Sequence, residues 1–148
     1  MAFEIFEHNF KEKGVVLAGI DGQGYVLAKL LAKQIESISP IEAKLVKISL
    51  DKQAPEQSEI SLDCDLKELK KKSIVMVDDV LNTGRTFAYG MKPFLNIEVK
   101  KIEIAVLINR GLSLFPIHAQ FTGYEVSTTI KDHIEVILSK DEMAVYLH

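Results

Sequence analysis

Short apolar runs alternate along the chain with segments in which apolar residues recur at helical spacing. The runs predict buried strands over four segments: 15–20, 44–50, 74–77 and 102–108. The helical spacing predicts two helices between them: 25–38, and 84–95 with interruptions at Gly90 and Pro93. Because strand and helix alternate up to residue 108, we expect an α/β fold with right-handed crossovers and a mostly parallel sheet.

The two ends of the chain and one inner segment depart from this alternation. Phe3, Phe6 and Phe10 predict an amphipathic helix over residues 1–13 that ends at Gly14. The C-terminal part carries shorter strand patterns: 121–126, 133–138 and an edge at 144–146. The segment 51–65 is polar and aperiodic, and such a long stretch is typical of a lid, a binding loop or disorder.

Composition limits the class of protein. With 148 residues, 47% of them hydrophobic and 26% charged, the chain fits one globular domain over 1–148 without a linker. A single cysteine, Cys64, excludes a disulfide scaffold and a cysteine-rich zinc site and favours the reducing cytoplasm. No apolar run reaches the roughly 18–20 residues of a membrane span, so we expect no membrane partner.

Charge argues against a nucleic-acid partner. The 18 basic and 21 acidic side chains give a net charge of −3, and only Arg85 and Arg110 are arginines. Scattered lysines on an acidic chain leave no electrostatic footprint for RNA, so we expect no RNA binding. The histidines lack metal-ligand spacing, and we interpret all four as ordinary surface residues: His8, His118, His133 and His148.

The segment 74–86 carries the chemistry. Ligands of open α/β sheets bind beyond the carboxyl ends of strands, which selects the loops 19–25, 78–86 and 109–116. In the second loop, backbone N–H groups, the Thr83 and Thr86 hydroxyls and Gly84 can cradle a phosphate, with the charge of Arg85 beside it. Asp78 and Asp79 suit a sugar diol or hydrated Mg²⁺. Together these groups describe a ribose 5-phosphate site.

Other interpretations of this segment are weaker. The two aspartates could merely end a strand while Thr83 caps a helix, but that leaves the convergence of polar groups in one loop unexplained. No Gly-Lys dipeptide forms a Walker A loop, and Gly22-Gln-Gly24 lacks the third glycine of a dinucleotide fingerprint. A response-regulator receiver needs a later aspartate at a strand end, which Asp132 and Asp141 do not supply.

Residues 77–86 resemble the phosphoribosyl pyrophosphate (PRPP) signature of type I phosphoribosyltransferases. Further segments resemble, in order and spacing, the pyrimidine operon attenuation regulators that double as uracil phosphoribosyltransferases: 2–9, 17–20, 105–111, 115–123, 125–128 and 133–138. This resemblance covers nearly the whole chain. It implies a three-layer fold with a mostly parallel central sheet flanked by helices, and a flexible hood loop at about 50–65.

The family resemblance implies PRPP-dependent transfer to a nucleobase, uracil or a purine, with release of Mg²⁺-bound pyrophosphate. Asp78 and Asp79 would hold the ribose hydroxyls, directly or through Mg²⁺. The 5-phosphate would be wrapped by Leu81, Asn82, Thr83, Gly84, Arg85 and Thr86. The pyrophosphate loop would be formed by Asp21, Gly22, Gln23 and Gly24. The hood would contribute Lys52, and the base would be faced by Asn109 and Arg110. Without the resemblance, Arg110 could equally be a surface arginine paired with a carboxylate.

Three departures from the family pattern lead to an alternative. The pyrophosphate loop usually reads Gly-Ile-x-Thr-Arg-Gly but here reads Gly19-Ile-Asp-Gly-Gln-Gly24, and the hood has Leu50-Asp-Lys52 in place of a Tyr-Arg pair. Basic positions that hold RNA in the regulators are matched by Ser113, His118 and Tyr124. The alternative is therefore a catalytically weak, PRPP- or nucleotide-binding regulatory homologue without RNA attenuation.

The family also implies two features of organisation. Its members commonly form homo-oligomers, so we expect at least a dimer. They usually carry a further helical segment ahead of the region that matches Ala2, and this segment is expected to be missing here.

Overall fold

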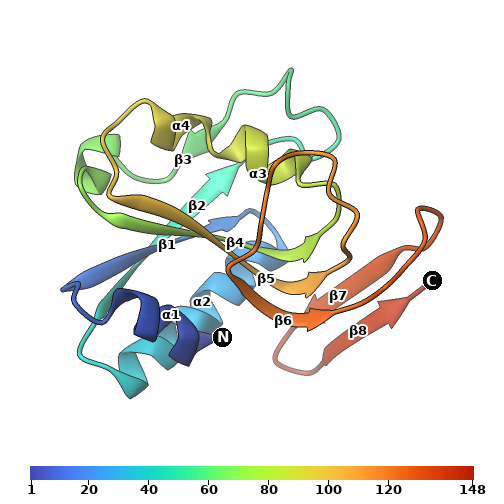
Figure 1. The fold of residues 1–148 in the computed structure, drawn as a ribbon, viewed down its shortest axis with the longest axis horizontal. Helices are drawn as coiled ribbons and strands as arrows, with labels where there is room; N and C mark the ends of the chain where they lie inside the picture. The colour runs from blue at the N-terminus through green and yellow to red at the C-terminus, as the bar shows by residue number, and fades with distance from the viewer.

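The computed structural model describes residues 1–148 and contains two sheets flanked by helices (Figure 1). The helices are α1 (Ala2–Asn9), α2 (Gln23–Ile38), α3 (Arg85–Gly90) and α4 (Lys92–Leu95), with a 3₁₀ turn at Leu66–Leu69. The strands are β1 (Gly14–Ile20), β2 (Glu42–Ser49), β3 (Ser61–Leu62), β4 (Ser73–Leu81), β5 (Lys101–Asn109), β6 (Phe121–Glu125), β7 (Ile134–Leu138) and β8 (Met143–Leu147). None of the helices is long and apolar enough to cross a membrane.

The main sheet has the strand order β3-β2-β1-β4-β5-β6. All its neighbouring strands are parallel except β3, which pairs antiparallel with β2 at one edge. The predicted α/β fold with a mostly parallel sheet is therefore confirmed. The chain runs from β1 outward to β2 and then returns to β4 on the other side of β1. Loops leaving the carboxyl ends of β1 and β4 therefore meet at the point where ligands bind in such sheets.

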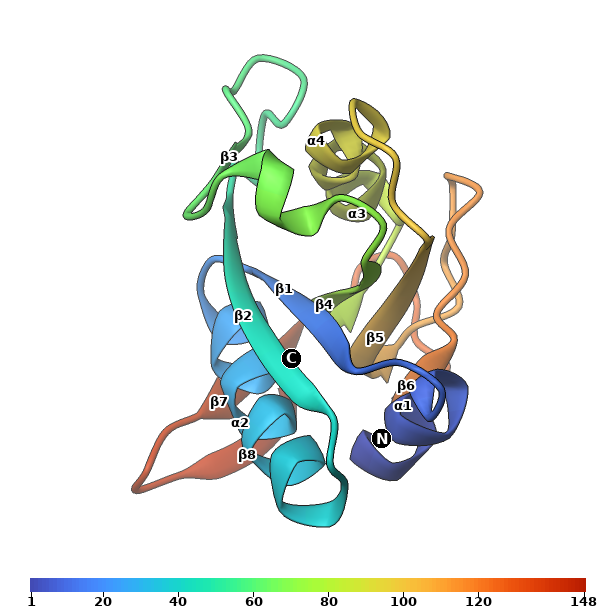
Figure 2. The same cartoon turned by 90° about the vertical axis from the view of Figure 1, so that its left-hand side faces the viewer.

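Helices cover both faces of this sheet, because alternate strand residues point to opposite sides. Along β4, Ile74 and Met76 join the cluster that contains Phe87 of α3 and Phe94 of α4. Val75 and Val77, which alternate with them, join the opposite cluster with α1 and α2. Figure 2 shows α1 and α2 on one side of the strands and α3 and α4 on the other. The sheet is thus the middle of three layers.

Strand β4 extends further than its sequence predicts. We expected the strand to stop at Asp78, but it continues to Leu81 because β5 remains beside it and pairs Val80 with Ile108 and Leu81 with Asn109. A neighbouring parallel strand supplies backbone partners whatever the polarity of the side chains. Both carboxylates therefore lie inside a strand.

The prediction for the N-terminal helix was wrong in its inward face. Phe3 and Phe10 are 59% and 62% exposed, whereas Ile5 is fully buried. The helix ends at Asn9, whose side-chain amide donates to the Ile5 carbonyl (2.8 Å). Ile5 and Asn9 lie one turn apart and form the line that packs on the sheet. Of the three phenylalanines, only Phe6 packs against this side of the sheet, so their spacing does not mark the buried face.

The C-terminal strands β7 and β8 form an antiparallel hairpin outside the main sheet. The hairpin docks through Ile134 and Val136, which pack with Ile108 of β5. A second contact comes from Gln23, whose side-chain oxygen accepts a hydrogen bond from the Leu138 backbone N–H (3.0 Å). Ile134 thereby holds the start of β7 against β5, and Gln23 holds its end.

Candidate functional site

A cavity of about 370 Å³ lies where β4 ends. Three segments that are far apart in the sequence contribute its walls: the hood, the β4–α3 connection and the start of β7. The lining residues are Lys52, Asp78, Asp79, Val80, Asn82, Thr83, Gly84, Arg85, Thr86, Phe87, His133 and Ile134. The predicted ribose-phosphate loop is therefore the floor of a real cavity, and the hood reaches it.

The two carboxylates differ in burial. Asp78 is only 3% exposed, and Asp79 faces the cavity beside it. Lys52 Nζ lies 2.9 and 3.0 Å from the two oxygens of Asp78 and 3.8 Å from Oδ1 of Asp79. Burial raises the pKa of Asp78 to about 7, an effect that the charge of Lys52 only partly offsets. The carboxylate pair is thus a partly desolvated acidic site, and one cation, the Lys52 ammonium, already lies against it.

The connection between β4 and α3 offers hydrogen-bond donors to an anion. Gly84 has a φ of +84°, which turns the chain into α3. The backbone N–H groups of Thr83, Gly84 and Thr86 have no acceptor within the protein. In contrast, the Thr83 carbonyl accepts from Leu114 N (2.8 Å) and Phe115 N (3.1 Å), so the loop is held from behind. Unpaired N–H groups on a fixed loop form a cradle for a phosphate.

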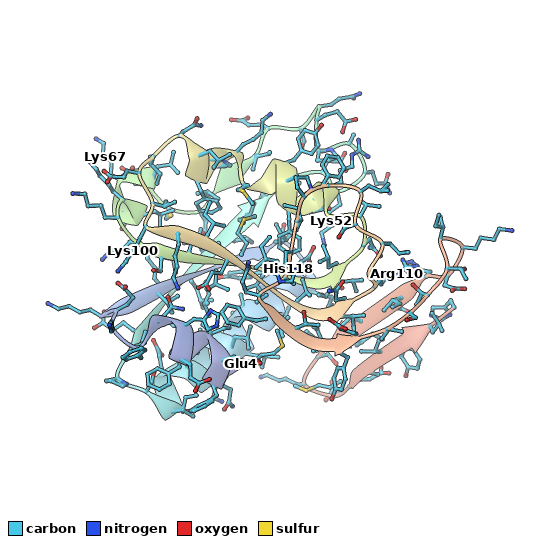
Figure 3. All side chains as sticks on the ribbon, viewed as in Figure 1. Glu4, Lys52, Lys67, Lys100, Arg110 and His118 are labelled. Atoms are coloured by element: carbon cyan, nitrogen blue, oxygen red, sulfur yellow. The ribbon has the colours of Figure 1, made fainter.

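A second ion pair ties the hood to the phosphate loop. The guanidinium of Arg85 pairs with Glu56, and both side chains remain partly exposed. Lys52 and Glu56 therefore bring opposite charges from the hood to the two halves of the site. Figure 3 shows Lys52 reaching toward the end of the sheet where the arrow of β4 points. Each half of the site is therefore contacted by a hood side chain of the opposite charge.

The residues present fit a Mg²⁺ ion that is shared with a substrate. No group of three or more His, Cys, Asp or Glu side chains converges to hold a metal. Asp78 and Asp79 supply two carboxylates, and the Lys52 ammonium already occupies a cation position between them. Mg²⁺ is commonly bound through one or two carboxylates together with water and substrate phosphates. The aspartate pair matches that mode.

The structure does not bring Arg110 into the cavity. The side chain is buried, and its guanidinium donates to the Thr128 hydroxyl, the Asn82 side-chain oxygen and the carbonyls of Thr129 and Asp132. Four of its five N–H donors are used by protein acceptors, and Arg110 does not line the cavity, so the predicted contact with a base is not made by this side chain. The alternative of a surface pair with a carboxylate is also wrong, because these partners are a hydroxyl, an amide and two carbonyls.

Other predicted residues lie beside the cavity and support its walls. Asp21 accepts from the N–H of Gly22 (3.0 Å), and Asn109 accepts from the N–H of Gly111 (3.0 Å). A Cβ atom at Gly24 would lie 2.6 Å from Oδ1 of Asp78, so only glycine lets α2 approach the carboxylate. Leu81 is buried in the core. None of these residues, nor Gln23, lines the cavity in this conformation.

Sequence reasoning missed the third wall. We interpreted His133 as an ordinary surface histidine, and the residue is exposed, but it also lines the cavity together with Ile134. Its backbone pairs in both directions with His148 at the open end of the hairpin (3.0 and 2.8 Å). The position depends on how the hairpin docks, which no local pattern encodes. The only sequence signal was the short strand that follows His133.

Comparisons with known proteins agree with the geometry. Residues 1–139 match the family model described as a phosphoribosyl transferase domain. The chain is 33% identical to the bifunctional protein PyrR of Fusobacterium nucleatum over 147 residues, covering 95% of this chain and 83% of that protein. It is 34% identical to the bifunctional protein PyrR of Clostridium novyi over 150 residues, with the same coverage of 95% and 83%.

A solved structure supports the fold independently. The hypoxanthine phosphoribosyltransferase of Trypanosoma cruzi superimposes with a TM-score of 0.71 over 84% of this chain and 72% of that one. At 13% sequence identity this similarity concerns the fold alone. The observed three-layer arrangement is therefore one already known from solved phosphoribosyltransferase structures.

Proposed function

Because this chain belongs to the phosphoribosyl transferase domain family, we propose that it transfers the phosphoribosyl group of PRPP to a nucleobase, uracil or a purine. A nitrogen of the base bonds to the anomeric carbon while the bond from that carbon to pyrophosphate breaks, which releases pyrophosphate and one proton. The relatives named above and the shared fold support the reaction class. The choice of base is left to experiment.

One observation carries the proposal: a carboxylate pair and an anion cradle share one cavity. Asp78 and Asp79 line one side of the cavity, and the unpaired backbone N–H groups of residues 83, 84 and 86 line another. A ribose 5-phosphate carries a diol and a phosphate at opposite ends, so it satisfies both sets of groups at once. Carboxylates are acceptors for hydroxyls, and backbone N–H groups are donors for phosphate.

The side chains around this ligand have distinct tasks. Thr83, Thr86 and Arg85 hold the 5-phosphate, while Asp79 accepts hydrogen bonds from the ribose hydroxyls. Asp78 and Asp79 would hold Mg²⁺, which neutralises the pyrophosphate leaving group when it is bound. Lys52 adds a positive charge on the hood side. Positive charge placed before the reaction where negative charge develops is a major source of catalysis.

A second candidate function is a nucleotide-binding regulator with little turnover. It is favoured by the scarcity of positive charge near the leaving group. Lys52 is the single hood cation that lines the cavity, and the neighbouring loop carries the acidic Asp21. Each missing charge-assisted hydrogen bond weakens transition-state binding by roughly 1.5–3 kcal/mol. In either case we propose that the protein does not attenuate transcription through RNA, since its net charge is −3.

Calorimetry with PRPP and Mg²⁺, followed by a pyrophosphate-release assay with uracil, hypoxanthine and guanine, tests both candidates. The double variant Asp79→Asn, Thr83→Ala should weaken PRPP binding at least tenfold. Asp141→Asn with Thr122→Ala makes the same chemical changes outside the cavity and should leave binding unchanged. Absence of PRPP binding by the unaltered protein contradicts both functions, and binding without turnover on any base selects the regulator.

A further inference from the structure

Arg110 is a buried connector between two walls of the cavity. It is 9% exposed and reaches the two walls from the end of β5. One terminal nitrogen donates to Oδ1 of Asn82 (2.6 Å), and the other donates to the carbonyls of Thr129 (2.7 Å) and Asp132 (2.8 Å). Nε donates to the Thr128 hydroxyl (2.7 Å). A planar guanidinium holds such partners in one fixed geometry.

The partners of Arg110 are direct neighbours of cavity residues. Asn82 precedes Thr83 of the phosphate loop, and Asp132 precedes His133 of the third wall. Figure 3 shows Arg110 at the end of the sheet where β5 points, beside the hairpin. Besides the packing of the hairpin on β5, one side chain therefore links the phosphate loop directly to the residue before His133.

The third wall has a hydrogen-bonded backbone and one side chain, that of His133, without a hydrogen bond. The Asp132 carboxylate accepts from Thr129 N (2.6 Å), and both backbone groups of His133 pair with His148. The His133 imidazole has no hydrogen-bond partner, its ring stacks on that of His148 (centroids 6.3 Å apart), and the residue lines the cavity. The ring nitrogens of an imidazole are hydrogen-bonding groups, so they can pair with the edge of a planar heterocycle.

Charge decides which part of a ligand lies against this wall. Arg85 stands at the phosphate loop, and Lys52 stands at the carboxylates, so both anionic parts of PRPP have a cation. The third wall offers Ile134, which is buried against Ile108 and Val126, and His133. An apolar face beside one polar aromatic ring suits an uncharged aromatic group. The base is the part of the ligand with that chemistry.

We propose that His133 reads the polar edge of the nucleobase and that Arg110 is the positioning residue that sets its distance from the phosphate loop. This inference rests on the proposed ribose-phosphate site and adds to it the residues that select the base. Arg110 does not touch the ligand. It acts through Asn82 on one side and through the Asp132 carbonyl on the other.

Binding of nucleoside monophosphates tests His133 without requiring turnover. Calorimetry measures Kd for UMP, IMP and ribose 5-phosphate. His133→Ala should change the ratio of the UMP and IMP constants by about 3- to 10-fold, the range of one neutral hydrogen bond. Its Kd for ribose 5-phosphate, which lacks a base, should stay within about twofold. His118→Ala, a histidine outside the cavity lining, is the matched control and should change neither value.

Variants of Arg110 separate positioning from general damage. Arg110→Ala should weaken UMP and IMP at least tenfold but ribose 5-phosphate less than threefold, because Leu114 and Phe115 still hold the Thr83 carbonyl. Arg110→Lys keeps one donor and should recover part of the nucleotide affinity. In an Arg110→Ala background, His133→Ala should no longer change the UMP to IMP ratio, since coupled residues are not additive.

The outcomes distinguish this inference from the function on which it rests. If the unaltered protein binds neither ribose 5-phosphate nor nucleotides, the proposed function fails and the inference fails with it. If it binds them and His133→Ala leaves their ratio unchanged, the inference alone is overturned. Equal losses of ribose 5-phosphate and nucleotide affinity in Arg110→Ala overturn the positioning role.

Discussion

The two sides of the cavity are held in different ways. The side built from the β4–α3 connection and the start of β7 is fixed by the buried Arg110, by two N–H groups on the Thr83 carbonyl and by strand pairing. The base of the hood packs on the core through Leu50, Ile60 and Leu62, whereas the hood tip, residues 51–59, is held mainly by its own contacts. Its internal hydrogen bonds join near neighbours, such as Asp51 N to the Ser58 hydroxyl and Gln57 N to the Ala54 carbonyl.

Only two ion pairs connect the hood tip to the fixed side: Lys52 with the aspartates and Glu56 with Arg85. The pair of Glu56 with Arg85 is exposed on both sides, and such pairs contribute about 0–1 kcal/mol, whereas buried networks with several short bonds are costly to break. The pair of Lys52 with Asp78 is exposed on the lysine side only. A ligand can therefore displace the hood contacts while the fixed wall keeps its shape. The fixed side is therefore a preformed binding surface, and the hood is a cover whose ion pairs a ligand can replace.

Asp78 lies on the boundary between these two sides, and removing its charge gives the largest expected effect. Burial raises the pKa of Asp78 from 3.8 to about 7, so the folded protein binds this proton more tightly than the unfolded chain. The unfolding free energy should therefore rise as pH falls from about 8 to about 5, by roughly 2 kcal/mol. Asp78→Asn should be more stable at pH 8 by about 2 kcal/mol and should lose most of this slope.

Urea unfolding in buffer with EDTA, repeated across this pH range, measures the Asp78 effect. Asp79→Asn is the matched control, since the more exposed neighbour should change the unfolding free energy by less than about 1 kcal/mol. The same slope in the unaltered protein and in Asp78→Asn contradicts the assignment. Loss of stability in Asp78→Asn at pH 8 shows instead that the ion pair with Lys52 outweighs the burial of the charge.

The sheet and the phosphate loop could be predicted because their signals are local. An apolar run such as 74–77 is a strand wherever it packs, and a phosphate loop needs its residues in sequence. The extent of β4 beyond Asp78 could not be predicted, since it depends on pairing with Ile108 and Asn109 across the sheet. The wrong inward face of α1 has the same origin, because tertiary packing selected Ile5 over the phenylalanines.

The candidate site shows the same division between local and distant information. Asp78, Asp79 and residues 82–86 line the cavity where the sequence placed them. Arg110 was expected at the base but is buried among carbonyls, and His133 is exposed as expected but also lines the cavity. Both findings depend on where the segment 127–134 lies, which is set by hairpin docking and by Arg110 itself. Sequence spacing cannot show that the segment 127–132 covers Arg110 and leaves His133 at the cavity.

Glycine substitutions test the rigidity of the fixed wall. Gly84 has a φ of +84°, and a Cβ atom there would lie 2.9 Å from Cβ of Ile117. Gly111 also has a positive φ (+66°), but a Cβ atom there would meet open space. Both alanine variants bear backbone strain of about 1 kcal/mol. Gly84→Ala should lose about 1 kcal/mol more stability and at least tenfold in ribose 5-phosphate affinity, since the loop must move away from Ile117.

Thermal unfolding and calorimetry on the two glycine variants measure this difference. Gly111→Ala should keep the ribose 5-phosphate affinity of the unaltered protein, because no cavity residue contacts the added methyl group. Equal affinities in the two variants contradict a rigid phosphate wall. Equal affinities would mean that the phosphate side of the cavity adapts to a ligand as readily as the hood side does.

Glu56→Gln gives the smallest expected effect and tests the hood side. In the structure the carboxylate of Glu56 pairs with the guanidinium of Arg85, whose positive charge a ligand phosphate would otherwise bind. Removing this internal competitor should raise ribose 5-phosphate affinity about 2- to 5-fold, the equivalent of one exposed ion pair, and should leave the unfolding free energy within about 0.5 kcal/mol. Glu59→Gln makes the same charge change at an exposed hood position without an ion pair, so calorimetry should find its affinity unchanged. A gain of equal size in both variants assigns the effect to overall charge, whereas a loss in Glu56→Gln makes the hood contact part of the binding surface rather than its cover.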